Sequence, residues 1–236
     1  MKILRRAGAA SSPAAVVVLA VLAAIFLMGT AAAALARSGL DGGSEAGGVY
    51  GEAVYRRVNV SEINAQLDPG LPRLPETAWA LGWGAFGGSP QFQFRAGSAR
   101  ATFESSGPSG ELSRLTFEDT RVGLLWRVLG GGRVRLLGGG AMGLSQVRLE
   151  VYRNRPTSLD EATGVHWSRY MLLLEPQVTL QFMAGDSAAL ELSAGYPLAT
   201  DFWNAQWGNV TGGTVPGRPA AFTGPNVRLS LLLGTL

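Results

Sequence analysis

The segment from Leu172 to Asp186, LLLEPQVTLQFMAGD, alternates between apolar and polar residues together with the positions just before it. Successive side chains of a β-strand point to opposite faces, so this pattern predicts one long strand with an apolar and a polar face. The apolar set is Tyr170, Leu172, Leu174, Pro176, Val178, Leu180 and Phe182, and the polar set is Arg169, Glu175, Gln177, Thr179 and Gln181. A fold for this chain must give the two faces different surroundings.

Seven further segments show the same period of two, and the connections between the eight alternate in length. The predicted strands are roughly 47–58, 77–87, 90–104, 112–129, 133–152, 166–183, 187–199 and 222–234. Long connections follow the first, third, fifth and seventh segments, and short Gly-containing turns follow the second, fourth and sixth. Transmembrane β-barrels have short periplasmic turns and long external loops. We therefore expect residues 47–236 to form an eight-stranded antiparallel transmembrane β-barrel, an up-and-down meander with both mature termini in the periplasm.

The first residues predict a targeting segment with a signal helix. A basic start is followed by the apolar run PAAVVVLAVLAAIFLMG and by Ala34-Leu35-Ala36, which fits the small-residue rule for signal peptidase. We expect a signal peptide at 1–36 and a flexible linker at 37–46. The alternative is a retained anchor, because the run is long enough to cross a bilayer.

The alternation assigns each face of the predicted barrel. An eight-stranded barrel is just wide enough to be filled by its own side chains, so inward arginines need acidic or polar partners. Glu175 and Glu191 are the obvious acids. The expected polar interior is Arg95, Arg121, Arg127, Arg133, Arg135, Arg169, Glu175, Gln177, Thr179, Gln181, Glu191 and Arg228, and the expected lipid-facing set is Trp79, Leu81, Trp83, Phe92, Phe94, Trp126, Leu174, Val178, Leu180, Leu229 and Leu231.

Local exceptions to this pattern also carry predictions. Pro176 lacks a backbone N–H, which predicts a bulge or local irregularity. The phase of the alternation slips within 112–121 and after Leu144, which indicates either bulges or strand ends that rise beyond the membrane. One short helix is expected in SEINAQL, with Ser61 as its N-cap.

Composition excludes several kinds of chemistry. The chain has no Cys and one His, so disulfides, thiol catalysis and Cys- or His-rich metal sites are excluded. Residues 1–36 hold three of the 20 basic residues and none of the 17 acidic ones, so the mature chain is formally neutral and has no charge excess for nucleic acid. No cofactor or metal is expected. The acids Asp119, Asp160, Glu161 and Asp201 match no calcium-loop spacing and are expected to be solvated loop acids.

Three stretches carry a family likeness: WALGWGAFGG, LEPQVTLQFMAGDSAALELSAGY and GPNVRLSLLLG. With them the chain resembles the small bacterial outer-membrane β-barrel proteins of the eight-stranded kind, over residues 47–236. The resemblance implies an outer-membrane location and outer-membrane lipid as a partner. The chain departs from that family at Leu236, because such barrels usually end in an aromatic residue.

Two groups of residues are candidates for function. His166 and Ser168 resemble the His-x-Ser pair of the outer-membrane lipid A deacylases, in which His acts as general base to the Ser hydroxyl. An orienting acid is missing from the predicted arrangement, since Glu175 lies on the opposite face. Phe202, Trp203 and Trp207 lie in a predicted external loop and are candidates for binding an extracellular ligand or protein.

We expect a non-enzymatic integral outer-membrane protein whose external loops are available for binding. Two alternatives remain. One is a lipid-modifying enzyme of the outer membrane that uses His166 and Ser168. The other is a soluble periplasmic barrel that binds an apolar ligand, which requires the apolar faces to point inward.

Overall fold

The computed structural model describes residues 46–89, 91–153, 164–200, 208–209 and 221–236. The expected signal peptide, the linker up to residue 45 and the three loop aromatics Phe202, Trp203 and Trp207 lie outside the described residues. No helix in the described ranges is long and apolar enough to cross a membrane.

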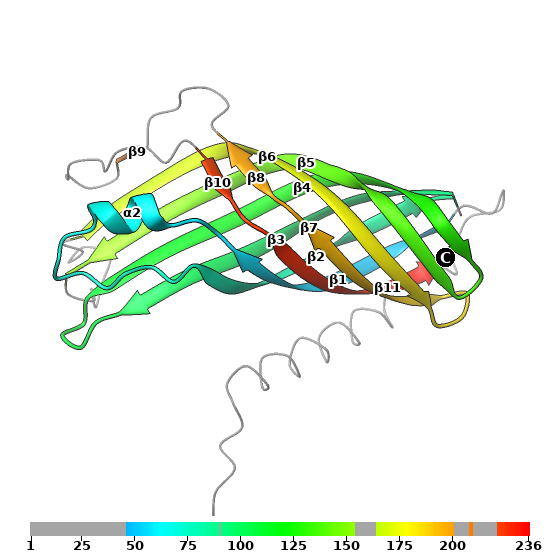
Figure 1. Cartoon of the computed structure of the whole chain (residues 1–236), viewed down its shortest axis with the longest axis horizontal. Coiled ribbons are helices and arrows are strands. Elements are labelled where there is room, and N and C mark those ends of the chain that lie inside the picture. Colours follow the sequence, from blue (N-terminus) through cyan, green and yellow to red (C-terminus); the bar gives the residue numbers. More distant parts are fainter. Residues whose placement is uncertain (1–45, 90, 154–163, 201–207, 210–220) are drawn as a thin grey trace, which may run out of the picture.

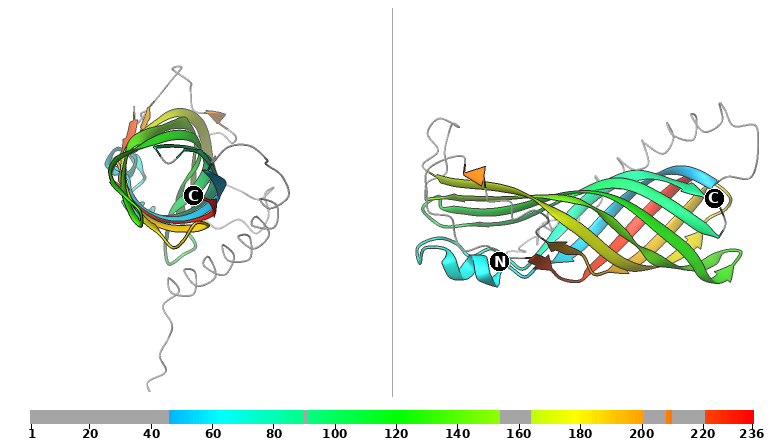
Figure 2. Two further views of the ribbon diagram at one scale, coloured as in Figure 1. Left: turned by 90° about the vertical axis from the view of Figure 1, so that its right-hand side faces the viewer. Right: turned by 90° about the horizontal axis from the view of Figure 1, so that it is seen from above.

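The described chain is a closed, antiparallel β-barrel of eight strands in meander order (Figure 1). Two of the eight strands are interrupted by proline: β7 and β8 are halves of one strand, and β10 and β11 are halves of another. Pairing of β1 with β11 closes the ring, which is seen end-on in Figure 2. The bounds are β1 Ala46–Arg57, β2 Thr77–Gly88, β3 Phe92–Ser106, β4 Leu112–Gly131, β5 Val134–Tyr152, β6 Gly164–Met183, β7 Ala188–Gly195, β8 Leu198–Thr200, β9 Gly208–Asn209, β10 Ala221–Thr223 and β11 Asn226–Thr235. The predicted eight-stranded antiparallel barrel and its meander order are therefore confirmed, while the predicted signal helix lies outside the described residues.

The three tight turns, the start of β1 and the C-terminus all lie at one end of the barrel (Figure 1). In the turn from β4 to β5, Gly130 and Gly132 have φ of 88° and 63°, a backbone conformation that favours glycine. Leu236 packs at this end against a small buried apolar cluster that includes Tyr50 and Leu232, and its N–H donates to the carbonyl of Asp186 (3.1 Å). The C-terminal segment thus helps to close this end of the barrel, which holds the three tight turns and is called the narrow end below.

Strands β3 to β6 run past the others at the opposite end and form an extension beyond the ring (Figure 2). The register is continuous from Leu112 to Trp126, so no bulge lies within 112–121. The phase slip occurs because the inner face of the strands changes from polar to apolar in the extension. The buried apolar side chains of the extension include Phe103, Leu115, Phe117, Val147, Leu149, Val151, Trp167 and Met171.

A strap made of α2 (Ser61–Gln66) and its flanking residues covers this apolar face. Ile63, Leu67 and Leu74 insert into the cluster, and Asn64 ties the strap together through two side-chain hydrogen bonds to the backbone of Leu74. The predicted helix is confirmed, but its predicted cap is wrong. Ser61 is the first helical residue, and Asn59 Oδ1 accepts hydrogen bonds from its N–H (3.1 Å) and Oγ (2.7 Å).

Pro176 lies in β6 without a register shift, so the predicted bulge at this position is absent. The carbonyl of Pro176 accepts a hydrogen bond from Tyr196 N (3.1 Å), between the end of β7 and the start of β8. The missing N–H of Pro176 therefore faces the break in the neighbouring strand, where no ladder bond is lost. A register shift does occur in β4, between Arg127 and Leu129.

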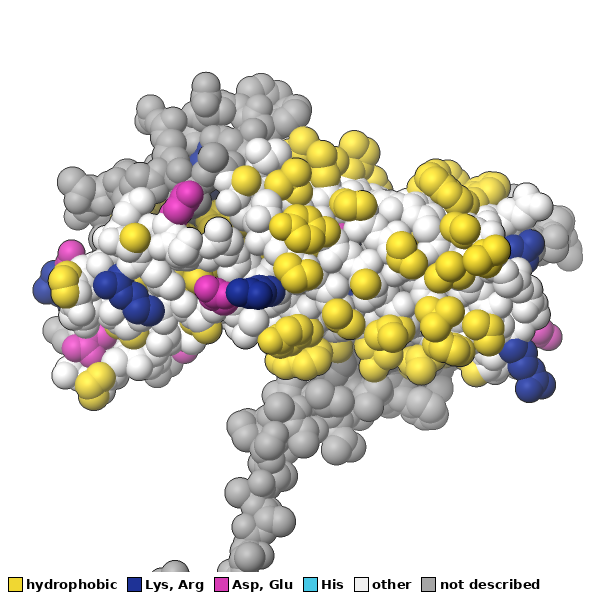
Figure 3. Space-filling model, viewed as in Figure 1, with side chains coloured by type: hydrophobic (Ala, Val, Ile, Leu, Met, Phe, Trp, Pro, Cys, Tyr) yellow, Lys and Arg dark blue, Asp and Glu magenta, His cyan; other side chains and the backbone are white. Residues whose placement is uncertain are grey.

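The outer wall carries a belt of exposed apolar side chains, with charged residues gathered at the two ends (Figure 3). Trp79, Trp83 and Tyr170 are 59%, 66% and 61% exposed, values expected only where something other than water covers them. Apart from Leu180 and Leu231, which are half-exposed on the same wall, the residues expected to face lipid are exposed: Trp79, Leu81, Trp83, Phe92, Phe94, Trp126, Leu174, Val178 and Leu229.

Candidate functional site

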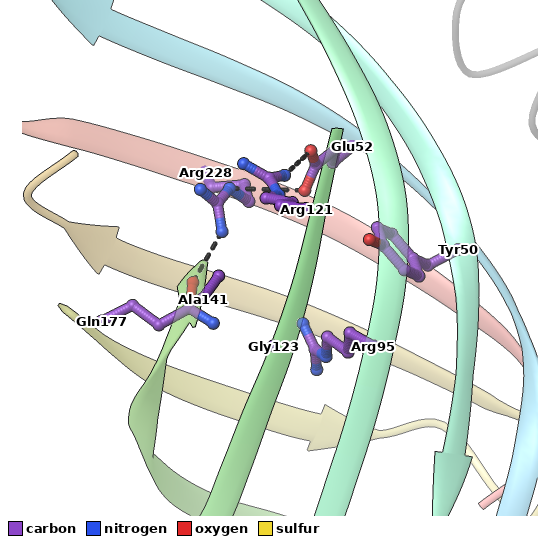
Figure 4. Close-up of a pocket in the computed structure, with 8 residues that line it drawn as sticks. All are labelled: Tyr50, Glu52, Arg95, Arg121, Gly123, Ala141, Gln177 and Arg228. Atoms are coloured by element: carbon purple, nitrogen blue, oxygen red, sulfur yellow. Dashed lines mark hydrogen bonds and ion pairs between the residues drawn. The ribbon is translucent and has the colours of Figure 1, made fainter. Parts of the chain in front are cut away.

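Two carboxylates and two arginines form a closed box in the middle of the barrel. Figure 4 shows three of its members, Glu52, Arg121 and Arg228. Arg121 donates to Glu52, and Arg228 donates to Glu175. The cross pairs are also present, with Arg121 Nη1 to Glu175 Oε2 and Arg228 Nε to Glu52 Oε2 both at 3.3 Å. Each acid therefore contacts both arginines. All four side chains are at most 8% exposed, so water does little to weaken their attraction.

Neutral polar side chains add further hydrogen bonds to this box. Asn226 Nδ2 donates to Glu175 (2.9 Å), and Arg228 Nη1 donates to Gln177 (2.7 Å). Because buried carboxylates and guanidinium groups have several hydrogen-bonding positions each, such partners are needed in addition to the opposite charge.

Two further buried ion pairs lie on either side of the box. Towards the narrow end, Arg95 Nη2 contacts Glu191 Oε1 (2.5 Å), which also accepts from Gln181 (2.8 Å). Towards the extension, Arg56 Nη1 contacts Asp119 Oδ2 (2.7 Å) and its guanidinium stacks on a Phe ring at 4.4 Å. The polar layer is thus continuous across the barrel.

This polar layer lies between two apolar ones. Along the inner face of β6, Met171 and Leu173 belong to the apolar cluster under the strap, Glu175 to Gln181 are polar, and Met183 packs on the small cluster at the narrow end. The cavity between Tyr50, Glu52, Arg95, Arg121 and their neighbours measures about 10 Å³, which is about the space of one water molecule. The interior is filled. The alternative of a barrel with apolar faces inward around a ligand is therefore wrong.

Most residues expected inside are buried there: Arg95, Arg121, Arg169, Glu175, Gln177, Thr179, Gln181, Glu191 and Arg228. Arg127 and Arg135 are half-buried near the narrow end. Arg133 is exposed, which corrects the expectation, because it lies in the tight turn between β4 and β5 and not on a strand face.

Two acids of the interior were missed. Glu52 lies on β1 with the same parity as buried Tyr50 and Val54, a signal present in VYGEAVYRR. Asp119 was expected to be a solvated loop acid, which is wrong. It lies on β4, buried, where it binds Arg56 and accepts a hydrogen bond from Ser145 (2.5 Å). The sequence pattern had offered only Glu175 and Glu191 as acidic partners for the inward arginines, and these two acids add to them.

The outer face of the extension carries a second, exposed set of ion pairs. Arg114 lies between Glu104 (2.7 Å) and Glu150 (3.2 Å), and Arg148 contacts Glu118 (3.3 Å). The hydrogen bond with Glu104 is the main cause of a raised pKa for Arg114, and burial followed by the Glu150 carboxylate raises the pKa of Tyr152. A surface with this charge density belongs in water rather than in lipid.

His166 and Ser168 both lie on β6 in this extension. The register pairs His166 with Glu150 and Ser168 with Arg148 on β5. Glu150 is thus the acidic residue that the backbone register places opposite His166. Glu175, by contrast, is buried in the interior box. No group of residues suited to a metal ion occurs in the described ranges.

The closed ring, the apolar belt and the filled polar interior together define an eight-stranded transmembrane β-barrel. No family model matches the sequence, and no curated protein matches it significantly.

Solved structures of similar fold include Ail, the attachment invasion locus protein of Yersinia pestis, in complex with the heparin analogue sucrose octasulfate (12% identity, 80% of this chain and 97% of that chain, TM-score 0.48). A second crystal structure of Ail is also similar (12% identity, 81% of this chain and 98% of that chain, TM-score 0.42). The outer-membrane protease OmpT of Escherichia coli is a third (10% identity, 80% and 95%, TM-score 0.36).

The box predicts that an interior carboxylate contributes much more to the free energy of unfolding than an exterior carboxylate does. Replacing Glu175 with Gln removes one charge shared by two buried arginines, so we expect the free energy of unfolding to fall by about 3–5 kcal/mol. Replacing Glu104 with Gln removes an exposed partner and should cost less than about 1 kcal/mol. Urea unfolding of both variants in phospholipid vesicles, followed by Trp fluorescence, measures the difference. Equal losses would contradict the role of the box.

Proposed function

We propose that the protein is a non-enzymatic integral outer-membrane β-barrel protein whose external end is available for binding. The observation that carries the proposal is the belt of exposed apolar side chains around a charged and filled interior. This arrangement is stable in a bilayer, where a closed ring also leaves no unpaired strand edge.

The direction of insertion follows from the connections. Short turns face the periplasm in transmembrane barrels, and the three tight turns lie at the end that holds the start of β1 and the C-terminus. Both mature termini are then periplasmic, after export directed by the segment 1–36. The extension of β3 to β6 and the strap project outward from the cell.

The binding surface is assigned to this external end. The outer face of the extension carries exposed ion pairs, and the connection from Thr200 to Ala221, which contains Phe202, Trp203 and Trp207, leaves the barrel here. Aromatic side chains bury a large area at a low cost in conformational entropy, which suits them to hold an extracellular ligand or protein.

Fractionation of expressing cells tests the proposal. The chain is expected in the outer-membrane fraction, with a band whose mobility on a denaturing gel differs between boiled and unboiled samples, because a folded barrel resists detergent until it is heated. Release with the soluble periplasm would contradict the membrane location. Recovery in the inner membrane at full precursor mass would show that residues 13–36 act as an anchor.

A second candidate function is hydrolysis of an acyl ester of outer-membrane lipid, and the pairing of Glu150 with His166 favours it. His166 would take the proton of the Ser168 hydroxyl as its oxygen attacks the ester carbonyl, and would return that proton to the leaving alcohol. Water would then hydrolyse the acyl-enzyme. Glu150 would orient the imidazole, although it already binds Arg114 at 3.2 Å.

Mass spectrometry of outer-membrane lipid from expressing cells separates the two candidates. Hydrolysis predicts lipid short of one acyl chain with the wild type, and full acylation with His166→Ala or Ser168→Ala. Ser106→Ala, at the exposed end of β3, is the control and should behave as the wild type. Unchanged lipid with the wild type would remove the second candidate and leave the first.

A further inference from the structure

A groove of about 490 Å³ lies on the outer wall of the barrel, where the apolar belt meets the charged face of the extension. It crosses β2 to β6. Its apolar lining comes from Leu81, Trp83, Leu144 and Tyr170, which are all exposed members of the belt. The groove is therefore continuous with the surface that we place in lipid.

Strand register explains why the wall is hollow here. Trp83, Ser98, Thr120 and Leu144 are successive cross-strand neighbours, so two short hydroxyl side chains lie between two large apolar ones. The short residues make the floor of the groove and the large ones its two sides. The floor therefore offers hydroxyl groups where the apolar belt meets the charged face of the extension.

A second row of cross-strand neighbours borders this floor on the side nearer the extension, and the residues in the middle of that row are polar. Leu81, Arg100, Glu118, Gln146 and Tyr170 are successive cross-strand neighbours. The groove thus has a guanidinium, a carboxylate and an amide at its outer rim, with an apolar or aromatic side chain at each end.

Arg100 is the cation of the rim, and its ion pair with Glu118 is a loose one. Its side chain is 66% exposed, and its Nη1 lies 3.7 Å from Glu118 Oε1, which is beyond hydrogen-bonding distance. Glu118 instead accepts a hydrogen bond from Arg148 (3.3 Å), which also donates to Gln146 (3.0 Å). Arg148 Nη2 is thus shared between these two neighbours, while Arg100 forms the longer ion pair with Glu118 and no hydrogen bond to any described residue.

We propose that this groove binds the phosphorylated sugar headgroup of a glycolipid of the outer leaflet. Arg100 would hold the phosphate, since a guanidinium matches a phosphate with two parallel hydrogen bonds. Ser98, Thr120 and Gln146 would bond sugar hydroxyls, and Trp83 and Tyr170 would pack against the ring. The acyl chains would continue onto the belt.

The dimensions and chemistry of the groove favour a glycolipid over a glycerophospholipid. A width of five strands exceeds what one glycerol phosphate fills, and hydroxyl and amide groups beside aromatic rings match a sugar better than a bare phosphate. The inference rests on the proposed function, because it requires this end of the belt to lie in the outer leaflet.

Lipid binding to the purified full-length chain tests the site. Native mass spectrometry in mild detergent would follow titration with bis-phosphorylated lipid A, its dephosphorylated form and phosphatidylglycerol. We expect Arg100→Gln to weaken binding of bis-phosphorylated lipid A at least tenfold, and Ser98→Trp to do the same by filling the floor. Arg57→Gln is the matched control. It removes an equally exposed arginine at the same end of the barrel, on β1, and should change binding less than twofold.

The outcomes separate this site from the proposed function. For the wild type, removal of the phosphates should reproduce the loss seen with Arg100→Gln, and phosphatidylglycerol should bind at least tenfold more weakly than lipid A. Equal binding by the Arg100 and Arg57 variants, or equal binding of the two lipids, would overturn the glycolipid site while a heat-modifiable band still showed a folded barrel. Absence of that band would instead contradict the transmembrane barrel itself.

Discussion

The pairing of buried arginines with buried carboxylates is the constraint on which the rest of this barrel depends. A guanidinium taken out of water costs several kcal/mol unless an acid and further hydrogen bonds replace the solvent. The partners come from strands far apart in the sequence, with Glu52 on β1, Asp119 on β4 and Glu175 on β6. They meet only when every intervening strand pairs in its observed register. A slip by one residue would turn these charges towards lipid, so the network selects one register around the whole ring.

The apolar layers on either side complete this arrangement. The strap places Ile63, Leu67 and Leu74 over the extension, and Leu236 packs at the narrow end. Both ends of the charged layer are thereby shielded from water, which strengthens each ion pair inside it. The same strap lets β3 to β6 continue past the belt with a dry inner face. The wall beyond the belt can then present a charged surface, with the groove at its lower edge.

The fold was predictable from the sequence because period-two alternation and alternating loop length are local signals. They located all eight strands and the exposed apolar wall that includes Trp83 and Val178. Which carboxylate pairs with which arginine was not predictable, since that depends on the register between strands. Asp119 was misplaced because it lies where the inner face turns from polar to apolar and the alternation loses contrast. The pairing of Glu150 with His166 could not be read from spacing along the sequence, because it depends on the register between β5 and β6. Pro176 was expected to bend its own strand, whereas the neighbouring strand contains the break.

The absence of cysteine allows the central claim, that the apolar face of the wall lies in lipid, to be measured directly. Single Cys residues introduced from Gln177 to Phe182 in β6 would carry nitroxide labels in barrels reconstituted into phospholipid vesicles. Collision rates with oxygen, which concentrates in the bilayer, and with a water-soluble nickel complex report what surrounds each label. The account predicts high oxygen accessibility at Val178, Leu180 and Phe182 and low accessibility at Gln177, Thr179 and Gln181. Maxima at the second set, or access of the nickel complex to Val178, would contradict it.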